Sequence, residues 1–274
     1  MELLQDLEAL ADWRRINPGP VLVPTMGNLH AGHLALVRRG QETGRPVIVS
    51  IFVNPLQFGP AEDFSSYPRT LEQDLARLRP AGVAAVFAPS EQALYPLGRQ
   101  GLTTVVPPAE LSERLCGLAR PGHFTGMATV VAKLFGLVQP GAAVFGEKDF
   151  QQLQIIRRMV LDLNLPVEIV AVPTLREPDG LALSSRNGYL DAGQRKLAPL
   201  LYQVLCGLAA APASDAARER AWSRLESAGF QPEYLDLLDA ATLQPAEGGG
   251  ALRWFAAARL GRTRLIDNVP VNPR

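Results

Sequence analysis

The chain has 274 residues, with 27 basic and 27 acidic side chains, zero formal net charge at pH 7 and 47% hydrophobic residues. A chain of this length can bury a full hydrophobic core without disulfides, and its balanced charge gives no general attraction to nucleic acid or anionic membranes. Its two cysteines form no paired motif, its first residues lack the pattern of a signal peptide, and no apolar run approaches the ~18 residues of a membrane span. We therefore expect a cytoplasmic protein without nucleic-acid or membrane partners.

Apolar runs and helical patterns alternate through the first two thirds of the chain. Thr70 and Gln73 are spaced as in a capping box, which predicts where one helix begins. In chain order, the pattern predicts a strand at 20–26, a helix at 32–44, a strand at 46–55, a loop at 56–69, a helix at 71–82, a strand at 83–89, a short strand at 103–108, a helix at 125–140, a strand at 142–145, a helix at 150–164 and a strand at 167–173.

This alternation predicts an α/β fold, a Rossmann-like parallel sheet with helices on both faces, over residues 1–173. After Pro173 the pattern changes. Two successive helical stretches are followed by two apolar strand-like stretches, at 192–211, 214–229, 232–240 and 251–269, with a turn at 247–250. Residues 174–274 are therefore predicted to form a smaller C-terminal α+β domain.

Polar side chains follow four of the predicted strands. Open parallel sheets bind ligands at the carboxyl ends of their strands, so these side chains are expected to meet in one pocket. The four exits carry His30 and His33, Asn54 and Gln57, Gly146 to Asp149 with Gln151 and Gln152, and Arg176 with Ser184 to Arg186.

His30 and His33 allow three interpretations. A zinc site needs three or four ligands, and the remaining histidine, His123, is distant in sequence. Chance polarity in a loop is the second interpretation. A phosphate site is favoured, because Gly27 and Gly32 permit a tight turn and the next helix begins at about Gly32, where its free N–H groups and positive dipole end attract an anion. Two imidazoles there can donate hydrogen bonds to a phosphate.

Other polar residues fit a nucleotide and a small acid. Lys148 is a compact cation suited to a polyphosphate, in a chain with only three lysines. Asn54 and Gln57 are neutral and suit a molecule with hydroxyl and carboxylate groups. Asp74 is a weak candidate for holding Mg²⁺ through water, although a solvated position on a helix surface is favoured.

Five segments together resemble the pantothenate synthetase family, within the H-x-G-H nucleotidylyltransferase superfamily. They are PTMGNLHAGHLALV, SIFVNPLQFGPAEDFSSYPRTLEQDL, RPGHFTGMATVVAKLFGLVQP, VFGEKDFQQLQIIRRMV and LREPDGLALSSRNGYL. The H-x-G-H piece alone is weakly specific, whereas GEKDFQQL and LSSRN narrow the resemblance strongly. It runs almost continuously from Pro24 to Leu190 and more loosely beyond.

The resemblance implies a ligase that makes pantothenate in two steps. Pantoate attacks the α-phosphate of ATP to give pantoyl adenylate and pyrophosphate, and β-alanine then displaces AMP. It also implies Mg²⁺ and a homodimer. Leu175 and Leu183 stand where the family usually has valine and methionine, swaps of similar size that should not change activity.

The resemblance also implies site residues. His33, as proton donor, would act with His30, Lys148 and Arg186 in catalysis. Gln57 and Gln152 would hold pantoate, Gln57 would also lie near β-alanine, and Pro24 and Asn54 would complete that subsite. The implied ATP site comprises Met26, Gly27, Asn28, Leu29, His30, Ala31, Gly32, His33, Gly146, Glu147, Lys148, Asp149, Leu175, Leu183, Ser184, Ser185 and Arg186.

Two alternatives stay open at the level of sequence. One is another adenylyl or cytidylyl transferase of the same superfamily, and the other is a non-catalytic nucleotide- or zinc-binding protein.

Because the mixed anhydride of the implied reaction must be protected from water, the loop 56–69 and the C-terminal domain are expected to act as lids.

Overall fold

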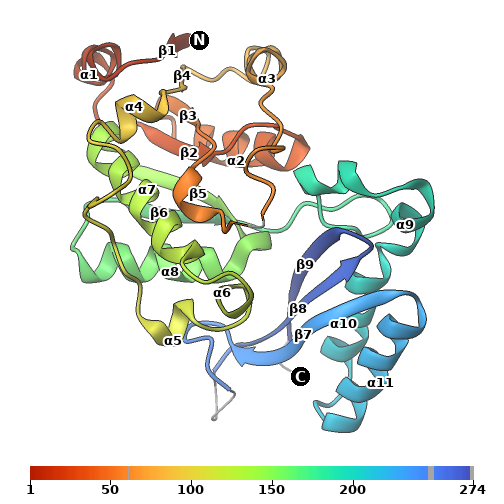
Figure 1. The fold of residues 1–274 in the computed structure, drawn as a ribbon. Helices are drawn as coiled ribbons and strands as arrows, with labels where there is room; N and C mark the ends of the chain where they lie inside the picture. The colour runs from red at the N-terminus through yellow and green to blue at the C-terminus, as the bar shows by residue number, and fades with distance from the viewer. Residues whose placement is uncertain (61, 246–249, 272–274) are drawn as a thin grey trace.

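The computed structural model describes residues 1–60, 62–245 and 250–271, which fold into two layered parts with the described chain ends at opposite ends of the molecule (Figure 1). The larger part contains a six-stranded parallel sheet in the order β1-β4-β3-β2-β5-β6. Its strands are β1 (Glu2–Leu4), β2 (Val21–Thr25), β3 (Val47–Ile51), β4 (Ala85–Phe87), β5 (Ala142–Gly146) and β6 (Glu168–Val172). The predicted Rossmann-like class is thereby confirmed.

Helices and short 3-10 turns connect these strands. The longer helices are α1 (Leu7–Ile16), α2 (Ala31–Gln41), α3 (Leu71–Leu78), α7 (His123–Val138) and α8 (Phe150–Asp162). The short elements are η1 (Pro55–Gln57), α4 (Glu91–Leu94), α5 (Ala109–Ser112), α6 (Cys116–Ala119) and η2 (Glu147–Asp149).

Both faces of the sheet are buried, and successive residues of a strand enter different cores. In β2, Leu22 packs with α1, α7 and α8 in one hydrophobic cluster, whereas Val21 and Val23 pack with α2 and α3 in another. This alternation is the period of two that a strand imposes on its side chains. It explains why β2 reads as a continuously apolar run, as is usual for a parallel strand covered on both faces.

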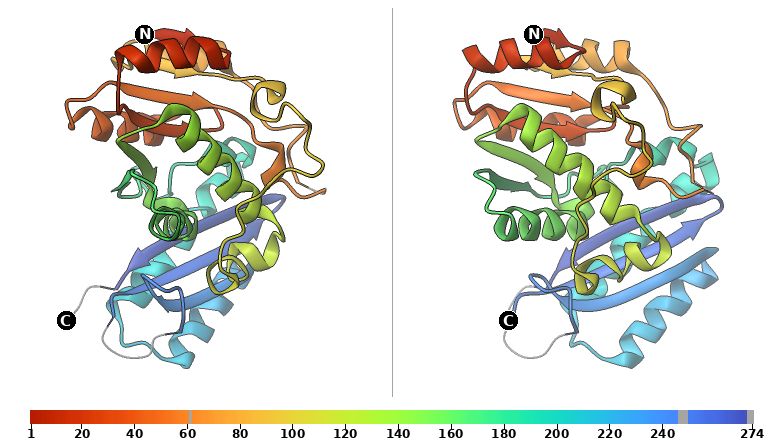
Figure 2. Two further views of the ribbon diagram at one scale, coloured as in Figure 1. Left: turned by 90° about the vertical axis from the view of Figure 1, so that its left-hand side faces the viewer. Right: turned by 60° about the vertical axis from the view of Figure 1, so that its left-hand side comes forward.

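The C-terminal part is a three-stranded antiparallel sheet covered by helices, as the two views in Figure 2 show. Its elements are η3 (Ser185–Tyr189), α9 (Ala192–Leu197), α10 (Leu200–Ala210), α11 (Asp215–Ser227), β7 (Phe230–Asp239), β8 (Leu252–Leu260) and β9 (Thr263–Pro270). A third cluster, with Leu205, Leu225 and Trp254, forms its core. The predicted α+β composition is confirmed, while the division at residues 173 and 174 stays a prediction.

Four local predictions were wrong. The stretch 251–269 is not one strand but two, β8 and β9, which pair with each other antiparallel. Thr70 makes no capping hydrogen bond, because its hydroxyl donates to Asp74 instead. Residues 103–108 form no strand. The N–H of Val105 donates to the hydroxyl of Thr129, so this part of the segment is bonded to helix α7 rather than to a neighbouring strand. The stretch 192–211 is two helices rather than one, because Pro199 supplies no N–H to continue the first. The turn predicted at 247–250 lies, except for Gly250, outside the described residues.

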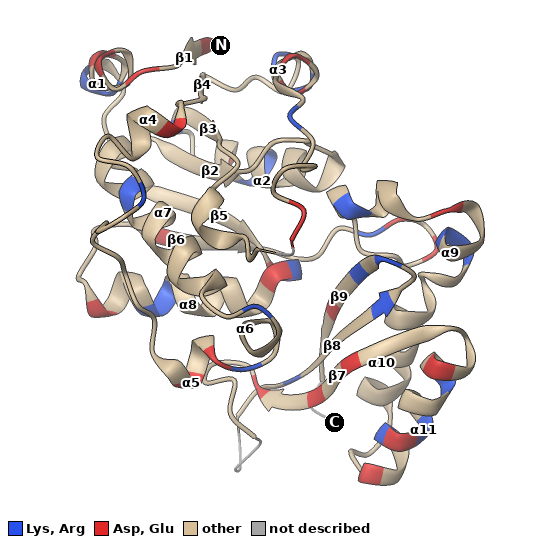
Figure 3. Ribbon diagram, in the orientation of Figure 1, with Lys and Arg blue, Asp and Glu red and all other residues tan. Residues whose placement is uncertain are grey.

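Charges of both signs are distributed over both parts of the molecule (Figure 3). No helix in the described ranges combines the length and apolar character that crossing a bilayer requires.

Candidate active site

A pocket lies at the carboxyl ends of β2, β3, β5 and β6, which are neighbours in the sheet. The four polar exits predicted from the sequence therefore converge, although Gln151 and Arg176 do not line this pocket, and Arg176 instead pairs with Asp267 of β9 at 2.6 Å. The predicted residues that line it are Pro24, Met26, His30, Gly32, His33, Asn54, Gln57, Gly146, Lys148, Asp149, Gln152, Leu175, Leu183, Ser184, Ser185 and Arg186. Both sets proposed from the family resemblance, for ATP and for pantoate, thus border the same space.

The turn after β2 is held in place by the carboxylate of Asp74. Its carboxylate oxygens accept the main-chain N–H groups of Asn28 at 2.9 Å and Leu29 at 2.7 Å, and the hydroxyl of Thr70 at 3.1 Å. Gly27 and Asn28 both have positive φ, and a Cβ on Gly27 would lie 3.1 Å from the Asp74 carboxylate. The aspartate therefore fixes a backbone shape that these two residue types tolerate.

This position contradicts the expected solvation of Asp74, whose exposure is only 1%. Both oxygens are occupied by the turn, and the residue does not line the pocket. The geometry therefore does not support Asp74 as a magnesium ligand. Within the described ranges, no group of three or more His, Cys, Asp or Glu side chains is arranged to hold a metal ion.

His30 and His33 cap the helix that follows. The N–H of Gly32 donates to Nδ1 of His30 at 3.1 Å, and the N–H of His30 donates to Nδ1 of His33 at 3.2 Å. Because a backbone N–H can only donate, both Nδ1 atoms are unprotonated, and each neutral ring carries its proton on Nε2. The two rings lie 4.1 Å apart, centroid to centroid. The Nε2–H groups are therefore the hydrogen-bond donors that these rings can offer.

The pKa values agree with two neutral imidazoles at pH 7. Burial, followed by the charge of Lys148, lowers the pKa of His30 to about 4. Burial and the neighbouring His30 lower the pKa of His33 to about 3. In the free protein these rings are hydrogen-bond donors rather than cations.

The turn after β5 supplies a cation and ties the two parts together. Lys148 and Asp149 line the pocket, whereas the Glu147 carboxylate leaves it and contacts Arg253 of β8 at 3.1 Å. The side-chain amide of Asn268 on β9 donates to the carbonyls of Glu147 and Lys148 at 2.9 and 3.0 Å. Glu147 thus joins the sheets, although the resemblance implied an ATP contact.

The loop 56–69 crosses from the sheet to η3. The Asp63 carboxylate accepts from Nη2 of Arg186 at 3.1 Å and from Nε at 3.4 Å. Tyr67 and Ser185 place their hydroxyl oxygens 3.5 Å apart. The loop therefore contacts two of the residues assigned to ATP.

The main-chain carbonyl of Gln57 is held by His123. Its carbonyl accepts from Nδ1 of His123 at 2.8 Å, so His123 carries its proton on Nδ1 and faces Arg120 with Nε2, 3.0 Å from Nη1. Burial and then Arg120 lower the pKa of His123 to about 4. Arg120 also contacts both carboxylate oxygens of Glu62, at 2.6 and 2.7 Å.

Sequence reasoning missed several lining residues, among them Tyr67, Arg120, His123 and Met127. The family-like segment RPGHFTGM contains three of them, but none of these follows a strand, so the strand-exit rule does not find them. Conversely, Gly27, Asn28, Leu29, Ala31 and Glu147 do not line the pocket. Leu29 is buried completely, and its contribution is the main-chain link to Asp74.

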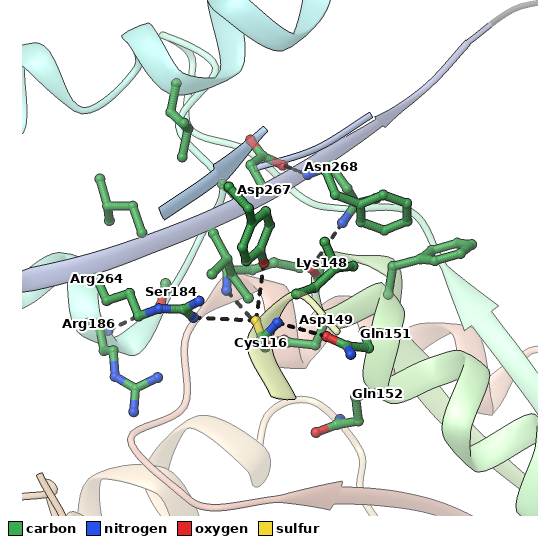
Figure 4. A pocket seen from close by; sticks show the side chains of 18 of the residues that line it. Cys116, Lys148, Asp149, Gln151, Gln152, Ser184, Arg186, Arg264, Asp267 and Asn268 are labelled. Atoms are coloured by element: carbon green, nitrogen blue, oxygen red, sulfur yellow. Dashed lines mark hydrogen bonds and ion pairs between the residues drawn. The ribbon is translucent and has the colours of Figure 1, made fainter. Parts of the chain in front are cut away.

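A second cavity continues from the pocket into the space between the two parts (Figure 4). It shares Lys148, Gln152 and Arg186 with the pocket and adds Cys116, whose Sγ lies 3.2 Å from the hydroxyl of Tyr234 and 3.3 Å from Nη1 of Arg264. The main-chain N–H of Cys116 donates to Gln151 at 3.0 Å. Gln151 thus lines the second cavity alone, whereas Gln152 lines both the cavity and the pocket.

Comparisons with known proteins agree over the whole chain. The family model described as Pantoate-beta-alanine ligase matches residues 2–270. A pantothenate synthetase of Acidithiobacillus ferrooxidans is 53% identical, over 99% of this chain and 100% of its own. The crystal structure of pantothenate synthetase from Thermus thermophilus has a TM-score of 0.92 at 47% identity, covering 100% of both chains. A pantoate-beta-alanine ligase from Francisella tularensis, complexed with beta-gamma ATP and beta-alanine, has a TM-score of 0.85 at 35% identity and covers 98% and 97% of the two chains.

Proposed function

The chain belongs to the pantoate-beta-alanine ligase family, and we infer from this that it condenses pantoate with β-alanine, converting ATP to AMP and pyrophosphate. The observation that carries the proposal is the convergence of four strand exits on one pocket, which is lined both by phosphate-type donors and by the neutral amides of Gln57 and Gln152. A phosphorylated acceptor would call for more cations beside those amides.

In the first step, a carboxylate oxygen of pantoate attacks the α-phosphorus of ATP, and the bond to the pyrophosphate oxygen breaks. Negative charge grows on the transferred phosphate. The Nε2–H groups of His30 and His33 and the ammonium of Lys148 would stabilise that charge, since all three line the pocket and two of them are preorganised by backbone hydrogen bonds.

In the second step, the amine of β-alanine attacks the acyl carbon of pantoyl adenylate. The bond to the AMP oxygen breaks, the nitrogen loses a proton, and an amide forms. Activation works because AMP leaves more readily than an unmodified carboxylate oxygen. Holding the adenylate beside Gln57 and Gln152 places the carbon for attack and shields it from water.

Magnesium is part of the proposal. Among the described residues that line the pocket, Asp149 is the carboxylate present. That fits a Mg²⁺ ion that keeps several waters and is bound mainly by the phosphates of ATP. Bound there, the ion would offset charge on the leaving pyrophosphate.

The proposal also includes a homodimer, a cytoplasmic location and a C-terminal domain, residues 174–274, that acts as a lid. Support for the lid comes from the contacts of Asn268 and Arg253 with the turn that carries Lys148. Limited proteolysis that cuts the loop 56–69 equally with and without ATP and pantoate would argue against the lids.

One assay tests the reaction. The protein is mixed with ATP, Mg²⁺ and pantoate, and pyrophosphate is measured with and without β-alanine. Pyrophosphate should require pantoate, and β-alanine should allow continued turnover and release AMP. No release of pyrophosphate on addition of pantoate would reject the proposal, and zinc in the purified protein together with no turnover would favour a binding protein.

A further inference from the structure

The side-chain amide of Asn54 has no free hydrogen-bonding capacity, although it lies at the edge of the pocket. Its nitrogen donates to Oε1 of Gln57 and to the carbonyl of Gly126, both at 3.1 Å. Its oxygen accepts the hydroxyl of Tyr95 at 2.8 Å and the N–H of Leu56 at 3.3 Å. A primary amide offers two donors and two acceptor positions, and all four are in use.

The orientation of this amide is fixed by two main-chain partners, one of which can only donate and one of which can only accept. Leu56 presents a main-chain N–H, which can only donate, and Gly126 presents a carbonyl, which can only accept. Turning the Asn54 amide over would set like against like at both places. The carbonyl of Gly126 can reach Asn54 because α7 passes very close to η1: a Cβ on this glycine would lie 2.1 Å from the carbonyl oxygen of Leu56.

The fixed amide of Asn54 determines how Gln57 presents itself. Because Asn54 offers an N–H, Gln57 must turn its oxygen toward it. The Gln57 nitrogen then faces Met26, with its donor 3.1 Å from the sulfur, on the side where both residues line the pocket. Gln57 is therefore displayed to a ligand as a hydrogen-bond donor, which suits a carboxylate or a hydroxyl oxygen.

Tyr95 begins the chain of hydrogen bonds from Tyr95 through Asn54 to Gln57, which we call the relay, and it lies outside the pocket. It follows α4, is 1% exposed, and packs edge-on against Phe52 with ring centroids 6.0 Å apart. The ammonium of Lys133 on α7 lies 5.8 Å from the centre of its ring. The hydroxyl of Tyr95 makes the shortest of the four hydrogen bonds to Asn54.

We propose that Tyr95 and Asn54 are positioning residues that hold the side-chain amide of Gln57 as a donor toward the carboxylate-bearing substrate. Asn54 acts through Gln57 and does not bind pantoate itself, in contrast to the direct contact expected from the sequence. The proposal rests on the proposed function, because it takes pantoate to be the ligand of Gln57. It accounts for a buried tyrosine hydroxyl and a fully satisfied asparagine next to a substrate site.

The first test is Tyr95→Phe, which removes one hydroxyl and keeps the ring. We expect the KM for pantoate to rise about 3- to 10-fold, as the loss of one hydrogen bond would give, while kcat and the KM for ATP change less than about 2-fold. Thr129→Val is the matched control, because it removes another buried hydroxyl, one that bonds Thr125 and Val105 and does not line the pocket. Thermal unfolding of both variants reports any loss of fold.

The second test asks whether Tyr95 acts through Gln57. In a Gln57→Ala background there is no amide to orient, so adding Tyr95→Phe should leave the KM for pantoate unchanged within about 2-fold. If Tyr95→Phe raises the KM for pantoate by the same factor in the Gln57→Ala background as in the unmodified chain, the proposal is overturned. A Tyr95→Phe enzyme whose KM for pantoate matches that of Thr129→Val would also overturn it. A parallel rise in the KM values for pantoate and ATP would also overturn it, since that indicates general loosening.

A third variant reverses the polarity. Asn54→Asp replaces the donor facing Gln57 by an acceptor, so the Gln57 amide should turn and present its oxygen to the pocket. The KM for pantoate should then rise about 10- to 100-fold, and an unchanged value in a folded variant would reject the relay. If the unmodified chain releases no pyrophosphate with pantoate, the proposed function itself fails, a result distinct from normal turnover with insensitive variants.

Discussion

Asp74 and Leu29 are 45 positions apart in the chain, yet a carboxylate oxygen of Asp74 accepts the main-chain N–H of Leu29 at 2.7 Å. Leu29 is completely buried, so its N–H has no access to water, and without the carboxylate it would have no partner of comparable strength. The same carboxylate holds Asn28. The shape of the turn that carries both histidines therefore depends on a residue from α3.

We predict that Asp74→Ala destabilises the protein by about 2–4 kcal/mol and raises the KM for ATP, because two main-chain donors lose a charged acceptor. Urea unfolding and pyrophosphate release at varied ATP measure the two effects. Thr70→Val is the control, since it removes only the hydroxyl that also bonds Asp74 and leaves both main-chain bonds in place. An Asp74→Ala enzyme with normal stability and a normal KM would show that the turn keeps its shape unaided.

Much of the fold is predictable because it follows from periodicity. The strands of the large sheet and their flanking helices are apolar runs and amphipathic stretches, and the rule that places ligands at carboxyl strand ends then brings His30, Gln57, Lys148 and Arg186 together. Asp74 shows where this reasoning ends. In α3 its spacing puts it on the same face as Leu75 and Leu78, but its charge favours a solvated position, and the main-chain partners that explain its burial come from a distant turn that no local pattern encodes.

The same limit applies to Tyr95 and His123. Neither follows a strand, and a lone buried tyrosine or histidine looks the same in sequence whether it packs in a core or orients a site. Their roles are defined by which atoms of Asn54 and Gln57 they meet. Likewise, Thr70 and Gln73 have the spacing of a capping box, but the hydroxyl of Thr70 is used by Asp74.

His33 has a structural role in the turn and a proposed chemical role in phosphate transfer, and a single substitution can separate the two. Nδ1 accepts the N–H of His30, which leaves Nε2–H as the donor that this ring can offer to a ligand. In His33→Asn, the side-chain oxygen can take the place of Nδ1, but nothing replaces Nε2–H. We predict near-normal stability and a loss of about 10²-fold in pantoate-dependent pyrophosphate release, as for a lost transition-state donor.

His33→Ala is the comparison, because it removes both functions. It should lose at least as much activity and also some stability. Stopped-flow or quench measurements of the first half-reaction, without β-alanine, give the rate. If His33→Asn retains more than about a third of the rate, the ring serves the turn alone and the phosphate role is wrong.

Stability should fall as the solution is acidified from pH 7 toward pH 4. The pKa values of His30, His33 and His123 are lowered from 6.5 to about 4, 3 and 4 in the folded chain. Below pH 6.5 the unfolded chain therefore binds protons that the folded chain does not, and each such proton lowers the free energy of unfolding by up to about 1.4 kcal/mol per pH unit. Above pH 7.5 the three histidines contribute no slope.

Urea unfolding between pH 5 and 7 tests this, since most carboxylates are still ionised there. His123→Asn is a useful variant, because its amide N–H can replace Nδ1–H toward the carbonyl of Gln57 without titrating. Its stability should depend less steeply on pH than that of the unmodified chain. Stability that is constant from pH 7 to pH 5 would contradict neutral, buried imidazoles.

Asp63 and Arg186 form a contact that ATP must disrupt if Arg186 binds phosphate through its Nε and Nη2 donors. The carboxylate lies 3.1 Å from Nη2 of Arg186, with the two side chains 24% and 33% exposed. A carboxylate and a phosphate oxygen compete for the same planar donors. Asp63→Asn should therefore free the guanidinium and lower the KM for ATP about 3- to 10-fold, since partly exposed pairs are worth about 1 kcal/mol. Glu62→Gln is the neighbouring control, because Glu62 contacts Arg120 and not Arg186. If the KM for ATP instead rises in Asp63→Asn, the loop 56–69 contributes to the bound state and Asp63 does not compete with the nucleotide.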